Sequence, residues 1–258
     1  MGEASESSEA TERALFVYDE QSERLVEKVR ANGVGTEIAL AVLEDFVKDP
    51  AACLQQMDHV VVAADLTGIK QVLRLSIEHG FNVGIVPGDG QKRLATYMDI
   101  PSRDDKAIEL ALQADPRPMD IVECNGEILL FRGVIGWLPV LDAPEELSRI
   151  GMLVRVLRRY GRLRLRPYRF TTANGKELAT ACSGCIIFQR HEGDLVSRLT
   201  RDDISVRDGA VGVVITSPFS VVEYVKFLMQ LFFPSRSKRG LPSAVGYLKS
   251  SELNIETD

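Results

Sequence analysis

Short apolar runs alternate with stretches of helical periodicity over the first 118 residues. The runs Ala14 to Tyr18, Val60 to Ala64 and Asn82 to Val86 are expected strands, and Val60 to Ala64 is uninterrupted and rich in β-branched residues, which is typical of a strand buried on both faces. Helical spacing is found at Glu23 to Ala31, Ile69 to His79, Lys92 to Met98 and Asp104 to Gln113, with a short helix at Ala51 to Met57. Thr36 to Val42 is either a strand or the start of a helix. This alternation predicts a parallel sheet with helices on both faces.

The pattern changes after Arg117-Pro118. The expected strands are Met119 to Cys124, Glu127 to Phe131, Leu163 to Ala173, Glu177 to Gln189 and Val211 to Thr216. Asn125-Gly126 and Asn174-Gly175 lie between such runs and predict hairpin turns. Two helices, Pro144 to Tyr160 and Val221 to Phe233, interrupt the strands. We therefore expect an acidic disordered tail over 1–12, an α/β domain over 13–118, and an antiparallel β domain with helical insertions over 119–258.

Composition narrows the functional classes. The chain has 258 residues, of which 45% are hydrophobic and 26% charged, as in ordinary globular proteins. No apolar run reaches the roughly 18–20 residues of a membrane span, and the N-terminus lacks the features of a signal peptide, so a cytoplasmic location is expected. The net charge of −6 and the absence of a nucleic-acid motif argue against nucleic-acid partners. The apolar helix expected at Val221 to Phe233 favours core or subunit packing, and we expect a homo-oligomer.

Two expected strands each end in a turn that opens a helix. The first runs into Asp65-Leu66-Thr67-Gly68, and the second into Pro87-Gly88-Asp89-Gly90. Turns of this kind present backbone N–H groups to the phosphates of a nucleotide. The sequence therefore predicts phosphate-binding architecture at this edge of the sheet.

The order and spacing of these motifs resemble the diacylglycerol kinase catalytic family, bacterial lipid kinases related to NAD kinases. Asp65 and Thr67 match the Asp and Thr of that family's Gly-Gly-Asp-Gly-Thr loop. Pro87 and Ala95 match the two ends of its second motif, and Ile100-Pro101 follows. The run from Pro116 to Asp120, and then Asn125-Gly126, is similar to the start of the family's second domain.

The resemblance covers Ala14 to about Ile255 and implies a fold and a chemistry. The implied fold is an NAD-kinase-like three-layer α/β domain followed by an antiparallel β-sandwich. The implied reaction is ATP-dependent phosphorylation of a lipid with Mg²⁺. It places the nucleotide at Asp65, Thr67, Gly88, Asp89, Gly90, Lys92 and Arg93. Asp65 is the candidate metal ligand, with the alternative that it caps the helix that follows.

The chemistry of the motifs departs from the family. Ala63, Ala64 and Leu66 replace the three loop glycines, which allow close phosphate approach. Asp89 adds negative charge to the second loop, and Asp19-Glu20 replaces an Asn-Pro at the end of the first strand. No residue matches the family's general base, so no catalytic residue is assigned. The leading hypothesis is a ligand-binding or regulatory domain with eroded catalysis, and the alternative is an active lipid kinase with a divergent nucleotide loop.

A basic segment forms the other chemical signal. Eight arginines occur between Arg149 and Arg169, with no acidic residue between Glu146 and Glu177. Arg155, Arg158, Arg159 and Arg162 are the candidates for contact with anionic lipid or an acidic partner. Such contact would attach the protein peripherally to a membrane. The alternative is a solvated helix face leading into an edge strand.

Cys182 and Cys185 form a lone C-x-x-C pair. The expected strand Glu177 to Gln189 would point the two thiols to opposite faces. We therefore interpret them as structural thiols, with a metal or redox site as the alternative.

Overall fold

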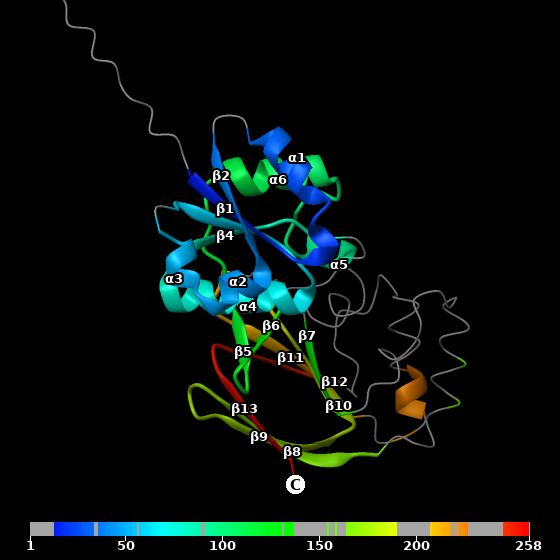
Figure 1. Cartoon of the computed structure of the whole chain (residues 1–258). Helices are drawn as coiled ribbons and strands as arrows, with labels where there is room; N and C mark the ends of the chain where they lie inside the picture. The colour runs from blue at the N-terminus through cyan, green and yellow to red at the C-terminus, as the bar shows by residue number, and fades with distance from the viewer. Residues whose placement is uncertain are drawn as a thin grey trace, which may run out of the picture. The chain divides into compact units, whose positions relative to one another are not determined.

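The computed structural model describes residues 13–33, 36–55, 57–88, 91–130, 132–136, 154, 158, 164–189, 207–217, 220, 222–226 and 245–257. The chain divides into two compact units, residues 1–118 and 119–258 (Figure 1). The expected N-terminal tail lies outside the described residues, as do nearly all of the expected helix at 144–160 and most of that at 221–233. In the part of the chain that the structure describes, no helix is long and apolar enough to cross a membrane.

A parallel four-stranded sheet forms the centre of the first unit. Its strands are β1 (Arg13–Tyr18), β2 (Glu37–Val42), β3 (His59–Ala63) and β4 (Asn82–Ile85), in the order β2-β1-β3-β4. All three pairings are parallel. The predicted parallel sheet is thus confirmed, and the ambiguous stretch from Thr36 is a strand.

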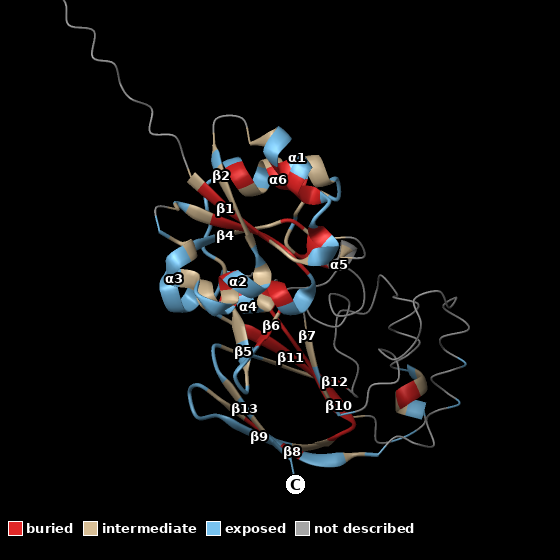
Figure 2. Ribbon diagram, viewed as in Figure 1, coloured by how far each residue is buried: buried red, intermediate tan, exposed pale blue. Residues whose placement is uncertain are grey.

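Helices cover both faces of this sheet (Figure 1). One face carries α1 (Leu25–Asn32) and α6 (Asp104–Gln113), and the other carries α2 (Leu43–Lys48), α3 (Pro50–Cys53) and α4 (Leu66–His79). Phe16 and Val61 of the sheet belong to one buried cluster with Leu25, Val29 and Ile108 of α1 and α6. The buried parts of β1 and α1 are red in Figure 2. The first unit is therefore an α/β/α arrangement. The helix expected at 51–57 ends earlier, at Cys53, and α2 precedes it.

The ends of α4 follow from its sequence. Asp65 is extended (φ −63°, ψ 172°) and its carboxylate accepts a hydrogen bond from the N–H of Gly68, which is the usual geometry of a helix N-cap. Gly80 ends the helix with φ +75°, and its N–H donates to the carbonyl of Ser76. A glycine tolerates this left-handed conformation without strain. Both ends of α4 can therefore be predicted from the sequence, the first from Asp65 and the second from Gly80.

The second unit consists of antiparallel strands. A hairpin joins β5 (Val122–Cys124) to β6 (Glu127–Leu129). One sheet has the order β12-β11-β10-β7, from Val245–Ser250, Val211–Thr216, Gly184–Phe188 and Arg132–Gly136. The other has the order β13-β8-β9, from Leu253–Thr257, Arg166–Thr172 and Glu177–Cys182.

The two larger sheets contribute to one hydrophobic cluster. Tyr168 and Phe170 of β8 lie in the same cluster as Ile187, Val213 and Ile215 of β10 and β11. Both Asn-Gly hairpins are confirmed by the pairings of β5 with β6 and of β8 with β9. The antiparallel character of this half was therefore correctly predicted.

One expected strand of this unit is divided in two, and β7, β12 and β13 were not expected. The single strand expected at Glu177 to Gln189 is two strands, β9 and β10, separated by a bend at Ser183. The N–H of Ser183 donates to the carbonyl of Thr216 (2.9 Å), and its hydroxyl lies within hydrogen-bonding distance of the same residue. Because the chain turns there, Cys182 and Cys185 are both buried in the shared cluster instead of diverging.

Candidate functional site

The carboxyl ends of β1, β3 and β4 converge on one cavity in the first unit. Tyr18 pairs with Ala63, and Val62 pairs with Ile85, so the residues that follow each strand meet at one edge. The cavity measures about 170 Å³. Its lining includes Asp19, Ser22, Ala64, Asp65, Gly88 and Gln91. In open α/β sheets, ligands bind outside the carboxyl ends of the strands where the strand order reverses, which here lies between β1 and β3.

Asp19 joins two of the loops around this cavity. One carboxylate oxygen, Oδ1, accepts a hydrogen bond from the N–H of Ser22 (2.8 Å), and the other, Oδ2, accepts one from the N–H of Asp65 (2.8 Å). The N–H of Asp19 itself donates to the carbonyl of Ala63 (3.3 Å). The end of β1 is thereby fastened to the loop that opens α4.

Gln91 makes the corresponding connection to the loop after β4. Its Nε2 donates to the carbonyl of Ala64 (2.7 Å), and its Oε1 accepts from the N–H of Gly88 (3.1 Å). The side chain amide thus bridges the ends of β3 and β4. Side-chain hydrogen bonds of Asp19 and Gln91 therefore hold together the ends of β1, β3 and β4, which are neighbours in the sheet.

Asp65 immediately precedes the first residue of α4 and is exposed. Its Oδ1 accepts from the N–H of Gly68 at 2.7 Å, which is the helix-capping role left open by the sequence. The two alanines before it are buried, so their methyl groups pack inside the protein. A Cβ at Gly68 would lie 2.8 Å from the Cβ of Ala64 and 2.5 Å from a methyl of Leu43. The close approach of α4 to this loop therefore requires glycine at 68.

These contacts bear on whether a nucleotide and its metal fit. The N–H groups of Ser22, Asp65, Gly68 and Gly88 already have acceptors from side chains of the chain itself. A phosphate binds such an edge by accepting from backbone N–H groups, and here it would also meet the two carboxylates. Within the described ranges, no group of three or more His, Cys, Asp or Glu side chains is placed to hold a metal ion. Among the described residues of this edge, these four N–H groups are therefore already used within the chain.

Of the other predicted site residues, the structure fully describes Gly88 and Thr67. Gly88 lines the cavity with Asp65. Thr67 is exposed in the first turn of α4 and is not part of the lining. Lys92 and Arg93 begin α5 (Lys92–Tyr97), but their side chains lie outside the described residues, as do Asp89 and Gly90.

Sequence reasoning did not identify the residues that organise the cavity. Asp19 was noted for its charge alone, although an aspartate directly after a strand and before a turn is a recognisable signal for a side chain that bonds to nearby N–H groups. It also caps the short helix Glu20–Ser22. Gln91 carries no such signal, because its two partners are 3 and 27 residues away in the sequence.

Asp120, from the run that resembles the start of the family's second domain, has an internal role in the second unit. Its carboxylate accepts a hydrogen bond from the N–H of Gly209 (2.6 Å), and its carbonyl accepts one from the buried Gln189. It therefore fastens the segment before β5 to the turn before β11 and to the end of β10.

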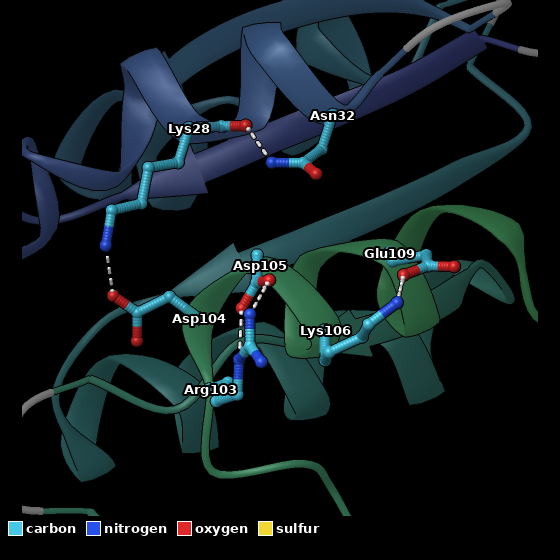
Figure 3. A network of polar contacts seen from close by, with 7 residues as sticks. All are labelled: Lys28, Asn32, Arg103, Asp104, Asp105, Lys106 and Glu109. Carbon is cyan, nitrogen blue, oxygen red and sulfur yellow. Dashed lines mark hydrogen bonds and ion pairs between the residues drawn. The ribbon is translucent and has the colours of Figure 1, made fainter.

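A second cavity in the first unit lies between α1 and the start of α6 (Figure 3). Its charges pair with one another: Lys28 with Asp104 at 2.6 Å, and Arg103 with Asp105 at 2.7 Å. The hydrogen bond from Arg103 lowers the pKa of Asp105. The first pair connects α1 to α6, the second lies within the start of α6, and neither leaves an unpaired charge among these four residues to attract a ligand.

Cys182 and Cys185 of the second unit are buried. Burial raises the pKa of Cys182 to about 11 and that of Cys185 to about 12. Both thiols therefore stay protonated and unreactive near neutral pH.

Of the four arginines predicted to contact lipid or a partner, Arg158 is exposed, whereas Arg155, Arg159 and Arg162 lie outside the described residues.

Solved structures with the same fold exist. A crystal structure described as a "putative diacylglycerol kinase" from Bacillus anthracis str. Sterne superposes with a TM-score of 0.67 at 14% identity, covering 96% of this chain and 87% of that one. A diacylglycerol kinase from the same organism superposes with a TM-score of 0.66 at 16% identity, covering 96% and 86%. No family model matches this sequence, and no curated protein matches it. The chain therefore has the diacylglycerol kinase fold that the motif order implied.

Proposed function

We propose that this protein is a diacylglycerol-kinase-like domain that has lost phosphoryl transfer and acts as a ligand-binding or regulatory module. One observation carries the proposal: the carboxylate of Asp19 accepts the N–H of Asp65, at the loop where the family resemblance places the nucleotide phosphates. A carboxylate at that position both occupies the donor and repels a phosphate. Phosphoryl transfer requires the phosphates to be held and their charge neutralised.

The remaining cavity supports a small ligand better than a nucleotide. Its volume of about 170 Å³ is below the roughly 300–1,000 Å³ of typical small-molecule pockets.

For the second domain, the hydrophobic cluster shared by its two larger sheets supports the proposed β-sandwich. A homo-oligomer remains part of the proposal, and sedimentation velocity would measure it.

Calorimetric titration with Mg-ATP tests the proposal, together with an assay of diacylglycerol phosphorylation in mixed micelles. We expect neither binding nor product. The comparison variants are Asp65→Ala and, as a matched control, Asp49→Ala, which removes a similar helix cap (Asp49 to the N–H of Ala52, 3.1 Å) away from the cavity. Micromolar binding that is lost in Asp65→Ala but kept in Asp49→Ala would favour the alternative, an active ATP-dependent lipid kinase with a divergent loop.

A further inference from the structure

The Asp19 carboxylate bonds in a way that distinguishes it from a simple helix cap. Asp49 and Asp65 each accept one hydrogen bond from the turn that they open. Asp19 accepts one such bond, from Ser22, and a second from Asp65, which is 46 residues away. Its two oxygens therefore bind N–H groups from two different strand ends.

We propose that Asp19 is a built-in oxyanion, an autoinhibitory contact that occupies the place at this sheet edge where an anionic ligand would otherwise bind. This rests on the proposed function and adds to it the group that closes the site. A carboxylate presents two acceptor oxygens on one centre, as one edge of a phosphate does, and it bonds to N–H donors with similar geometry. The chain thus supplies its own anion, covalently attached and present at all times.

The surroundings keep the carboxylate in place. The N–H of Asp19 donates to the carbonyl of Ala63, at the end of the β1–β3 ladder, and Gln91 bridges the next two strand ends. Removal of the carboxylate alone would leave the N–H of Asp65 without its acceptor beside an existing cavity, whereas the N–H of Ser22 would lose its side-chain acceptor and keep the backbone carbonyl of Asp19 (3.0 Å). An unsatisfied N–H group in such a place favours an added anion of matching size.

Chemical rescue tests this inference. We expect Asp19→Ala to lower the Tm by ~5 °C relative to the wild type. Sodium formate, which restores a carboxylate without a chain, should raise the Tm of Asp19→Ala saturably above that in sodium chloride of equal ionic strength. Inorganic phosphate is the second probe, because a similar effect would mean that the opened site accepts a phosphate group. The wild type and Asp49→Ala should respond to formate no more than to chloride.

A second measurement does not require the alanine variant to fold. Asp19→Asn preserves the shape of the side chain but has only one acceptor oxygen, so one of the two N–H groups loses its side-chain acceptor. The larger effect is expected at Asp65, because the N–H of Ser22 also donates to the carbonyl of Asp19. Hydrogen exchange at the Asp65 or Ser22 amide should accelerate at least tenfold in this variant. Unchanged protection of both amides, or equal formate effects in Asp19→Ala and Asp49→Ala, would overturn the inference. Mg-ATP binding by the wild type would instead refute the proposed function, so the two failures are distinguishable.

Discussion

Substitution of Asp65 separates its two candidate roles, helix cap and metal ligand. The Oδ1 of Asp65 lies 2.7 Å from the N–H of Gly68, at the start of a 14-residue helix. Loss of an N-cap costs about 0.5–2 kcal/mol, and a negative charge at a helix N-terminus adds roughly 0.3–1 kcal/mol at an exposed position. For Asp65→Ala we therefore expect the free energy of unfolding to fall by about 1–2 kcal/mol.

Serine provides the discriminating variant. Its hydroxyl caps helices about as well as a carboxylate does, but it is a poor ligand for Mg²⁺, which prefers carboxylate oxygens. If Asp65 is a cap, Asp65→Ser should retain most of the stability and lose only the charge contribution, below about 1 kcal/mol. If Asp65 binds a metal, Asp65→Ser should behave like Asp65→Ala.

Urea unfolding followed by far-UV circular dichroism, with and without MgCl₂, measures both effects. Asp49→Ala serves as the control and should lower stability by less, because the helix that it caps has only four residues. Two results would refute the capping argument: serine as damaging as alanine, or stabilisation of the wild type by Mg²⁺ that both variants lose.

Three further predictions concern the second unit. Burial raises the pKa of Cys185 from 9.0 to about 12, so its contribution to stability is intact below pH 9 and is lost as the pH rises from 9 toward 12. Between pH 8 and pH 10, urea unfolding of the wild type should lose ~1.4 kcal/mol more than that of Cys185→Ala; an equal loss in both would contradict the burial argument. Asp120→Ala should lower stability by about 1 kcal/mol and accelerate exchange at the Gly209 amide, with unchanged protection there as the contrary result. Arg164, Arg166 and Arg169 are exposed and form no ion pair in the part of the chain that the structure describes; their joint replacement by glutamate should weaken sedimentation with anionic vesicles at low salt, and unchanged binding would leave the solvated-face interpretation.

The elements of the first unit were predictable because local and tertiary preferences agree there. Val60 to Ala64 is apolar throughout and buried, with all but Ala64 in β3, and α4 has both a capping aspartate and a terminal glycine. α2 was missed because six residues are too few to display helical periodicity. In the second unit, β7, β12 and β13 were not predicted. Apolar and polar positions alternate weakly in β7 and β12. β13 does alternate, but it has only five residues, of which none is fully buried.

The juxtaposition of the two loops was predictable from the sequence. The strand-turn pattern predicts that Asp65 and Gly88 lie at one edge of the sheet, because parallel strands bring their carboxyl ends together, and both residues line the same cavity. The bond from Asp65 to Asp19 depends on the register that sets Tyr18 beside Ala63. No local pattern encodes that register, so a site held together by long-range side-chain contacts stays hidden until the strands are paired.

The packing of Gly68 against Ala64 has a consequence for how this loop can be changed. The methyl group of Ala64 fills the space that glycine at 68 leaves open, so replacing Ala64 by glycine alone creates a void there. A substitution at Asp19 alone likewise removes two hydrogen bonds. Contacting residues of this kind show non-additive effects. These positions are therefore energetically coupled, and we expect a glycine-rich phosphate loop to be introduced here without loss of stability only by simultaneous changes at several of them.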